Sequence, residues 1–361
     1  MVVSYTQGGR WKLALLETDP RRFEPLDLRM EPLESLAANG RAAYFVGGSP
    51  TEEPAVVRMT FAAAEVEVIK RSREERQDPA LVSVPEAITF DSGGRPVHAF
   101  LYSPGNPGFA APAGARPPLI VMSHGGPTGA TDPTLDPEVQ FWTSRGFAVV
   151  DVNYSGSTGY GRAYRERLNG QWGVADVQDV VAAAKDVVAR GKADPQRLAI
   201  RGGSAGGYTT LAALTFTDTF QAGASYYGIS DLEVLARDTH KFESRYTDSV
   251  LGPYPAQQAL YHDRSPIHFV DRLDCALILF QGLEDKVVPP NQSQTMADAV
   301  RRKGLPVAYV AFEGEQHGFR KAETRVRALE AELYFYGKVF GFTPADAIAP
   351  VPIDNLPAAR D

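Results

Sequence analysis

One serine placed among glycines is the feature of this sequence that most directly suggests chemistry. The segment from Gly202 to Gly206 reads G-x-S-x-G with Ser204 at its centre. It follows an apolar, strand-like run and precedes a helical run, which is the strand–turn–helix context of a nucleophilic serine. A glycine-rich structural turn and a phosphate-binding loop are the alternatives. Because no G-K-[ST] follows, the phosphate loop is disfavoured, and we predict that Ser204 is a nucleophile.

A serine hydroxyl needs a neighbouring base, and the base needs an acid to orient it. Asp285 follows the strand-like run 275–282, and His317 follows the next such run, 307–314. The chain order serine, acid, histidine is the order found in hydrolases with this serine motif. The sequence therefore predicts a catalytic set of Ser204, Asp285 and His317.

Other side chains compete for the roles of acid and base. Glu284 is the alternative acid, although the neighbouring position of a turn usually points elsewhere. His262 and His268 are alternative bases, but both lie in "YHDRSPIHFV", which has no strand before it. These placements favour Asp285 and His317.

Hydrolysis through a tetrahedral intermediate also needs two donors for the oxyanion. The backbone N–H of Ala205, the residue after the nucleophile, is expected to be one of them. The loop "MSHGGPTGA" (122–130) follows an early strand-like run and offers the N–H of Gly126 or Gly125. The alternative for this loop is a plain Gly-Pro turn.

The elements that must position these residues alternate along the chain from about residue 86. Near-continuous apolar runs indicate strands buried on both faces, and helical spacing separates them. This pattern predicts a doubly wound, mostly parallel α/β sheet. The expected strands cover 118–124, 147–154, 197–202, 222–228, 275–282 and 307–314, and the expected helices cover 174–190, a start at 204, 292–303 and 321–339.

The segment before this alternation reads differently, as short β-strands separated by turn residues. A weak repeat relates residues 8–17 to 39–48 and resembles less than two blades of a β-propeller. A small irregular β-domain is the alternative. We expect three parts, which are a β-strand segment over 1–79, a catalytic domain over 80–342 and a C-terminal tail over 343–361.

Composition limits the partners and the compartment. The 361 residues carry a formal net charge of −7, which argues against nucleic acid or an anionic membrane as a partner. No apolar run is long enough to span a bilayer, and the first residues do not read as a signal peptide. With Cys275 as the single cysteine, no intrachain disulfide forms, and we expect a cytoplasmic protein.

Together these motifs resemble the catalytic domain of the prolyl oligopeptidase family of serine peptidases, nearest to its acylaminoacyl-peptidase and aminopeptidase-like branch. The motifs, in family order over about residues 80–340, are "SHGGPTG", "NYSGSTGYGRAYRERLNGQWG", "GGSAGGY", "LFQGLEDKVVPP" and "GEQHGF". The resemblance implies an α/β-hydrolase fold preceded by a partial β-propeller. It also implies hydrolysis of short peptides, or of aminoacyl or acyl-aminoacyl amides, by an acyl-enzyme route without metal or organic cofactor.

The same resemblance implies roles for further residues. It assigns the second oxyanion donor to the N–H of Gly126 and a substrate pocket to Phe242 and Tyr246. Val287 stands where some relatives place a polar residue that holds the substrate backbone. Family members carry a complete propeller, so we expect this chain to be a fragment or a truncated form. The remaining propeller portion and a second copy of the chain are its expected partners.

Two other functions fit the same residues. A carboxylesterase would use the same catalytic set without useful amidase activity. A non-catalytic binding module would keep the fold alone, although the intact Ser–Asp–His set argues against it. Our prediction is a serine peptidase in which His317 acts as the general base for Ser204.

Overall fold

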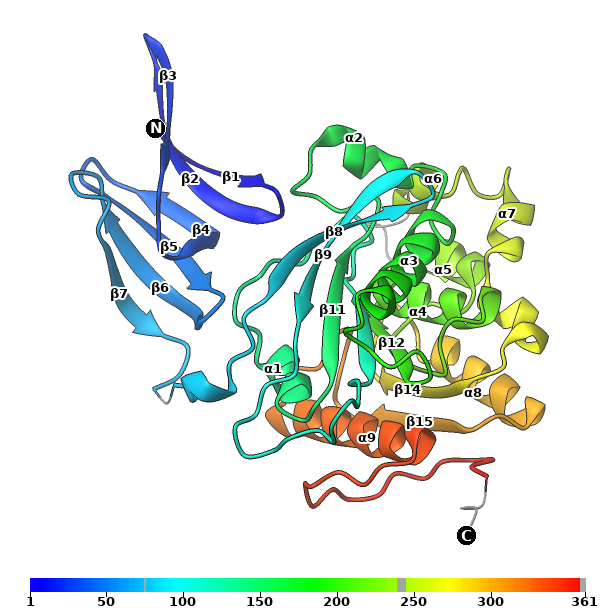
Figure 1. Ribbon diagram of the computed structural model, residues 1–361. Coiled ribbons are helices and arrows are strands. Elements are labelled where there is room, and N and C mark those ends of the chain that lie inside the picture. The colour runs from blue at the N-terminus through cyan, green and yellow to red at the C-terminus, as the bar shows by residue number, and fades with distance from the viewer. Residues whose placement is uncertain (75, 239–244, 358–361) are drawn as a thin grey trace.

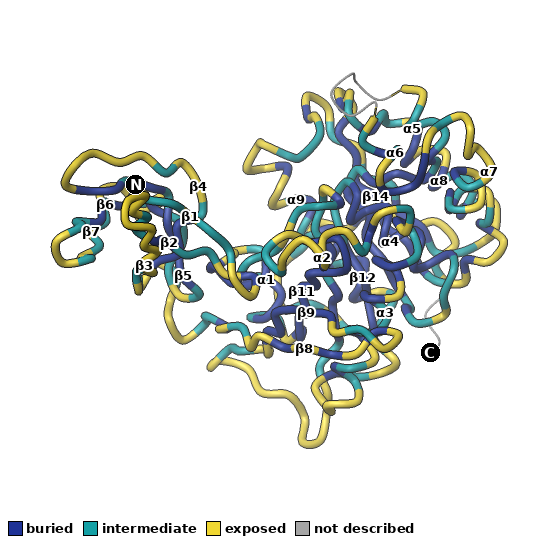
Figure 2. The backbone as a smooth tube through the Cα atoms, turned by 90° about the horizontal axis from the view of Figure 1, so that it is seen from above, coloured by how far each residue is buried: buried dark blue, intermediate teal, exposed yellow. Residues whose placement is uncertain are grey.

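The computed structural model describes residues 1–74, 76–238 and 245–357, and Figure 1 shows their arrangement. The described chain forms an eight-stranded sheet covered by helices and two smaller antiparallel sheets built from the first seven strands. The small sheets form a lobe of their own beside the larger part (Figures 1 and 2).

The large sheet has the strand order β15-β14-β13-β12-β10-β11-β9-β8. Strands β10 to β15 pair in parallel, and β9 pairs antiparallel with both β11 and β8. The bounds are β8 (Glu86–Ser92), β9 (Arg95–Tyr102), β10 (Leu119–Ser123), β11 (Ala148–Asn153), β12 (Leu198–Gly203), β13 (Ala222–Tyr226), β14 (Ala276–Gly282) and β15 (Val307–Phe312). This is the α/β-hydrolase fold, as predicted.

Helices cover both faces of this sheet because successive side chains of each strand point to opposite faces. On β10, Val121 packs with the core cluster that includes α3, α4 and α8, whereas Ile120 packs with the cluster that includes α1 and α9. The helices are α1 (Pro137–Thr143), α2 (Arg162–Arg165), α3 (Ala175–Ala189), α4 (Ala205–Phe216), α5 (Leu232–Asp238), α6 (Tyr246–Val250), α7 (Gln258–Asp263), α8 (Asn291–Lys303) and α9 (Ala322–Phe340).

The N-terminal lobe consists of a three-stranded and a four-stranded antiparallel sheet. The first is β1 (Val2–Gln7), β2 (Arg10–Thr18) and β3 (Arg21–Leu26), and the second is β4 (Glu31–Ala38), β5 (Ala42–Ser49), β6 (Glu52–Thr60) and β7 (Val66–Arg71). Four antiparallel strands are the size of one propeller blade. The two sheets agree with the predicted partial propeller.

The segment after α9 packs against the large sheet. Val307 at the start of β15 exchanges two backbone hydrogen bonds with Asp354, at 3.1 and 2.8 Å, and Val351 is buried. The described part of the predicted tail therefore reaches the edge of the large sheet at β15. In the described residues, no helix is long and apolar enough to cross a lipid bilayer.

Candidate active site

Ser204 lies in the sharp turn between β12 and α4, with φ 56° and ψ −119°. A positive φ is strained for a residue with a Cβ, and such strain gathers at functional sites. Flanking glycines make the turn feasible. A Cβ on Gly206 would lie 2.0 Å from the carbonyl oxygen of Ser123, and one on Gly202 would lie 2.5 Å from the Gly206 carbonyl. The close packing of strand against helix thus requires glycine at both positions of the motif.

The three predicted catalytic side chains meet at this turn. His317 Nδ1 lies 2.8 Å from Asp285 Oδ2, and His317 Nε2 lies 2.8 Å from Ser204 Oγ. Because an ionised carboxylate only accepts hydrogen bonds, the proton of the neutral ring belongs on Nδ1. Nε2 is then free to accept the hydrogen bond that the Ser204 hydroxyl donates.

The carboxylate of Asp285 is fully buried at the end of β14. Its Oδ1 accepts hydrogen bonds from the backbone N–H of Val287 at 2.8 Å and of Val288 at 2.9 Å. These bonds fix the orientation of the carboxylate, so that Oδ2 faces the imidazole.

The competing residues do not reach the serine. Glu284 is exposed, and its backbone N–H donates to the carbonyl of Glu315. His262 and His268 stack on each other with ring centroids 4.2 Å apart, and the imidazole that contacts Ser204 is that of His317. The structure therefore brings together the favoured residues and not their alternatives.

The loop after β10 approaches the turn from the other side. A Cβ on Gly125 would lie 3.3 Å from the Gly203 carbonyl oxygen and 3.7 Å from Ser204 Cβ, so the loop and the turn are in contact. Among the described residues, neither the Gly126 nor the Ala205 amide donates a hydrogen bond to a protein group. Both amides remain available for an oxyanion, the role predicted for them.

His124 holds this loop in place. Its ring stacks on Tyr154 with 4.2 Å between centroids, and its Nε2 lies 2.7 Å from the Ser157 hydroxyl. The Tyr154 hydroxyl is within 3.0 Å of the carbonyls of His124 and Pro127. Desolvation lowers the pKa of His124 to about 4, so this ring is neutral near pH 7 and serves the loop's structure.

The predicted substrate residues occupy different surroundings. Phe242 lies outside the described residues. Tyr246, at the start of α6, places its hydroxyl 2.7 Å from Thr128 Oγ1 and accepts a hydrogen bond from the Thr128 amide at 3.1 Å. Val287 is half-buried and packs against the core on the α3, α4 and α8 face. Their roles in substrate binding stay predictions.

A cavity of about 910 Å³ opens beside Ser204 and His317. Its walls come from the loop after β10, from α1, from residues 318–320 and from α9. Among its residues, Tyr227 packs edge-on against the His317 ring at 4.9 Å between centroids, and burial raises the pKa of the Tyr227 hydroxyl. This volume suits a small ligand.

An ion cluster lies against this cavity, which two of its members, Arg201 and Glu138, line. Arg201, in β12, donates from Nε to Glu332 of α9 at 2.9 Å and also pairs with Glu138 of α1. Glu332 accepts a further hydrogen bond from the Tyr226 hydroxyl at 2.5 Å. Burial alone lowers the pKa of Arg201, but the carboxylates of Glu138 and Glu332 outweigh it, so the pKa is raised and the guanidinium stays charged.

The sequence alone did not predict this cluster or the position of Tyr227. The sequence does contain a signal for the start of α1 at Asp136-Pro137-Glu138, since aspartate is a common N-cap and proline is common in the first turn. The meeting of Glu138, Arg201 and Glu332 depends on three distant elements and leaves no local signal.

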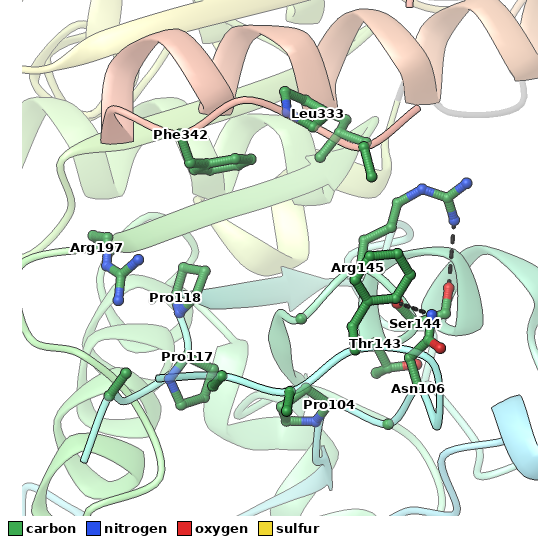
Figure 3. Close-up of a pocket in the computed structure, with 18 of the residues that line it drawn as sticks. Pro104, Asn106, Pro117, Pro118, Thr143, Ser144, Arg145, Arg197, Leu333 and Phe342 are labelled. Atoms are coloured by element: carbon green, nitrogen blue, oxygen red, sulfur yellow. Dashed lines mark hydrogen bonds between the residues drawn. The ribbon is translucent and has the colours of Figure 1, made fainter. Parts of the chain in front are cut away.

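A second cavity, of about 730 Å³, lies elsewhere (Figure 3). It is bordered by Pro104, Pro118, Arg145 and Phe342, and none of the three catalytic candidates lines it. The described residues contain no group of three or more His, Cys, Asp or Glu side chains that could hold a metal ion.

The fold and the site define an α/β-hydrolase with a Ser–His–Asp triad geometry. A model of the prolyl oligopeptidase family matches residues 133–343. The chain belongs to the prolyl oligopeptidase family.

This chain aligns with only part of the length of its known relatives. It is 30% identical to dipeptidyl aminopeptidase BIII of Pseudoxanthomonas mexicana over 264 residues, which are 69% of this chain and 38% of that protein. A puromycin-hydrolyzing peptidase of Mycobacterium tuberculosis superposes with a TM-score of 0.94 at 48% identity. A puromycin hydrolase superposes with a TM-score of 0.93 at 42% identity. Each of these two alignments covers 98% of this chain and 54% of the other. The chain spans 29–45% of the length of three curated relatives.

Proposed function

We propose that this chain is a serine peptidase that hydrolyses short peptides and aminoacyl or acyl-aminoacyl amides through an acyl-enzyme on Ser204. The observation that carries the proposal is the pair of 2.8 Å contacts that link Ser204 Oγ to His317 and His317 to Asp285. A serine hydroxyl in hydrogen-bond reach of an oriented imidazole is an activated nucleophile.

The proposed reaction begins when Ser204 Oγ attacks the carbonyl carbon and His317 Nε2 takes the hydroxyl proton. Asp285 stabilises the imidazolium that results. The amides of Ala205 and Gly126 stabilise the oxyanion of the tetrahedral intermediate. His317 then gives the proton to the departing amine. A water molecule, deprotonated by the same ring, releases the acyl group and regenerates Ser204.

The substrate class draws support from the relatives. The solved neighbours at 42% and 48% identity are named for the hydrolysis of puromycin, and other relatives are named acylamino-acid-releasing enzymes. Puromycin contains an amide between an amino acid and a nucleoside amine. We therefore propose aminoacyl amides with a free amino group, puromycin among them, as the first substrates to test.

The test is a panel of aminoacyl-, acyl-aminoacyl- and prolyl-anilides with puromycin and a p-nitrophenyl ester, each assayed with Ser204→Ala and with Ser144→Ala as the control. We expect amide turnover that Ser204→Ala reduces by roughly 10⁴–10⁶-fold in kcat and that Ser144→Ala preserves. A loss of less than tenfold contradicts the role of Ser204. Hydrolysis of the ester alone would instead favour the carboxylesterase.

A further inference from the structure

Most apolar side chains that line the 910 Å³ cavity beside the triad belong to one of the two core clusters of the large sheet. Phe141, Phe319 and Leu329 line the cavity and pack with the core cluster of α1 and α9. Neither Tyr246, which is predicted to form the substrate pocket with Phe242, nor Val287 is part of its wall. The described residues predicted to bind substrate thus lie outside this cavity.

The position of His317 identifies which half of a substrate this cavity receives. In the proposed reaction, His317 Nε2 delivers its proton to the departing amine, so that amine lies next to the imidazole. His317 lines the cavity, and the residues that follow it, Gly318 to Arg320, continue the same wall. The departing part of the substrate therefore extends into this cavity.

Two arginines in the wall form no ion pair within the part of the chain that the structure describes. Arg320 and Arg325 are exposed, and neither guanidinium forms an ion pair or a hydrogen bond with another residue in the described part of the chain. By contrast, Arg201 in the same wall is paired with Glu138 and Glu332.

The two carboxylates of the wall each bind a protein group, and neither forms an ion pair with Arg320 or Arg325. Glu138 is bound by Arg201, and Asp136 Oδ1 accepts a hydrogen bond from the Glu138 amide at 2.8 Å. Asp136 attracts Arg325 only at longer range. The guanidinium groups of Arg320 and Arg325 can therefore bind a ligand that ends in an anion.

We propose that this cavity is the leaving-group site and that Arg325, together with Arg320, binds the terminal carboxylate of a short peptide leaving group. Arginine is suited to this task because its planar guanidinium can bind a carboxylate with two hydrogen bonds. The inference rests on the proposed function and makes it more specific: the substrates are small peptides with a free C-terminus.

The test compares two peptides of one sequence, an aminoacyl-glycyl-glycine with a free carboxylate and the same peptide with a C-terminal carboxamide. The readout is the ratio of kcat/KM for the acid to that for the amide. We expect the wild type to favour the acid and Arg325→Gln to lower the ratio by roughly 10–100-fold, the range for hydrogen bonds to charged groups. Arg325→Lys should restore part of the ratio.

Arg327→Gln is the matched control on the same helix, because the Arg327 guanidinium donates to the carbonyls of Ala349 and Pro350 instead. This variant should keep the wild-type ratio. Wild-type turnover of an aminoacyl-anilide, whose aniline leaving group carries no carboxylate, tests the proposed function by itself. Anilide turnover with an acid-to-amide ratio unaffected by the combined Arg320→Gln and Arg325→Gln change would overturn this inference alone, whereas absence of anilide turnover would overturn the proposed function.

Discussion

At the scale of single residues, the carboxylate of Asp285 is held in place by hydrogen bonds to both of its oxygens. Its two oxygens accept hydrogen bonds from His317 Nδ1 and from the amides of Val287 and Val288, all between 2.8 and 2.9 Å. A carboxylate satisfies all three donors at once, because it has acceptor sites only. An amide group of the same shape cannot.

Asp285→Asn should therefore lower kcat by about 10⁴-fold, because the side-chain amide favours the wrong tautomer of His317. The measurement is steady-state hydrolysis of an aminoacyl-anilide. Glu284→Gln, which changes the adjacent exposed carboxylate, is the control and should stay within a few-fold of wild type. Equal losses in both variants would contradict the assignment of Asp285.

His124 supplies a prediction about pH. Desolvation lowers its pKa to about 4 in the folded chain, whereas a histidine in an unfolded chain has a pKa of about 6.5. Between these pH values the unfolded state binds more protons, so the contribution of His124 to the free energy of unfolding falls as pH falls. The stability difference between wild type and His124→Asn should narrow from pH 6.5 to pH 4. Chemical denaturation at each pH measures it, and a constant difference would contradict the pKa of His124.

The catalytic candidates were predictable because each follows a strand-like run whose end must lie at one edge of a parallel sheet. Ser204 and His317 are 113 positions apart, yet topology alone brings their elements together. Tyr227 and Arg325 were not predictable, because their placement depends on the direction of a side chain in a folded neighbourhood. A sequence pattern predicts the helices, the strands and their ends more reliably than it predicts the direction of a side chain.

At the scale of elements, the site depends on how closely α4 crosses β10. Gly206 in the first turn of α4 faces the carbonyls of Ser123 and His124, which a Cβ would approach to 2.0 and 2.9 Å. Those atoms are backbone, so they cannot move aside as a flexible side chain would. Ser123 Oγ also donates to the Gly206 carbonyl at 3.0 Å, which ties strand and helix together.

Gly206→Ala should lower the free energy of unfolding by about 1–3 kcal/mol or more, as overpacking does. It should also reduce kcat, because α4 can only accommodate the methyl group by moving Ser204 and Ala205. Gly40→Ala is the control, since a Cβ at Gly40 would meet nothing within 4 Å. Thermal unfolding and anilide hydrolysis of both variants measure the effect, and equal behaviour of the two would contradict the close approach.

Long, periodic elements were predicted within one to three residues of their observed ends. The helix expected over 174–190 is α3 (Ala175–Ala189), and the strand expected over 275–282 is β14 (Ala276–Gly282). The short helices α1, α5 and α7 were not predicted, because six or seven residues carry too little periodicity. Tertiary packing, as in the contact of α1 with the buried Arg201, stabilises such segments instead.

At the scale of the whole molecule, the N-terminal lobe contacts loops near the active site through backbone hydrogen bonds. The Leu135 amide donates to the Ser49 carbonyl at 2.8 Å, and the Gly9 amide donates to Gly159 at 3.4 Å. Leu135 directly precedes Asp136 and α1 in the cavity wall. The lobe thus contacts the segment that leads into the wall of the proposed leaving-group site, and Figure 2 shows the lobe beside the hydrolase part.

The lobe has a much smaller core than the large sheet. Its buried apolar residues are Leu13, Met30, Ala43, Phe45, Ala55, Val57 and Met59. A small core opens at a lower free-energy cost than a large one. We expect peptides from β1 to β7 to exchange amide hydrogens through openings of lower free energy than peptides from β12 to β14. Hydrogen exchange followed by mass spectrometry measures this, and equal protection of both parts would contradict independent opening of the lobe.

The measurement that tests the central claim most directly is covalent labelling with a fluorophosphonate, located by mass spectrometry. The reagent reacts with a serine that a neighbouring base activates. If Ser204 is the nucleophile, we expect one label per chain on Ser204 and much slower labelling in His317→Ala. A label on a different serine, or no label on a folded chain, would contradict the claim that Ser204 is the nucleophile of this protein.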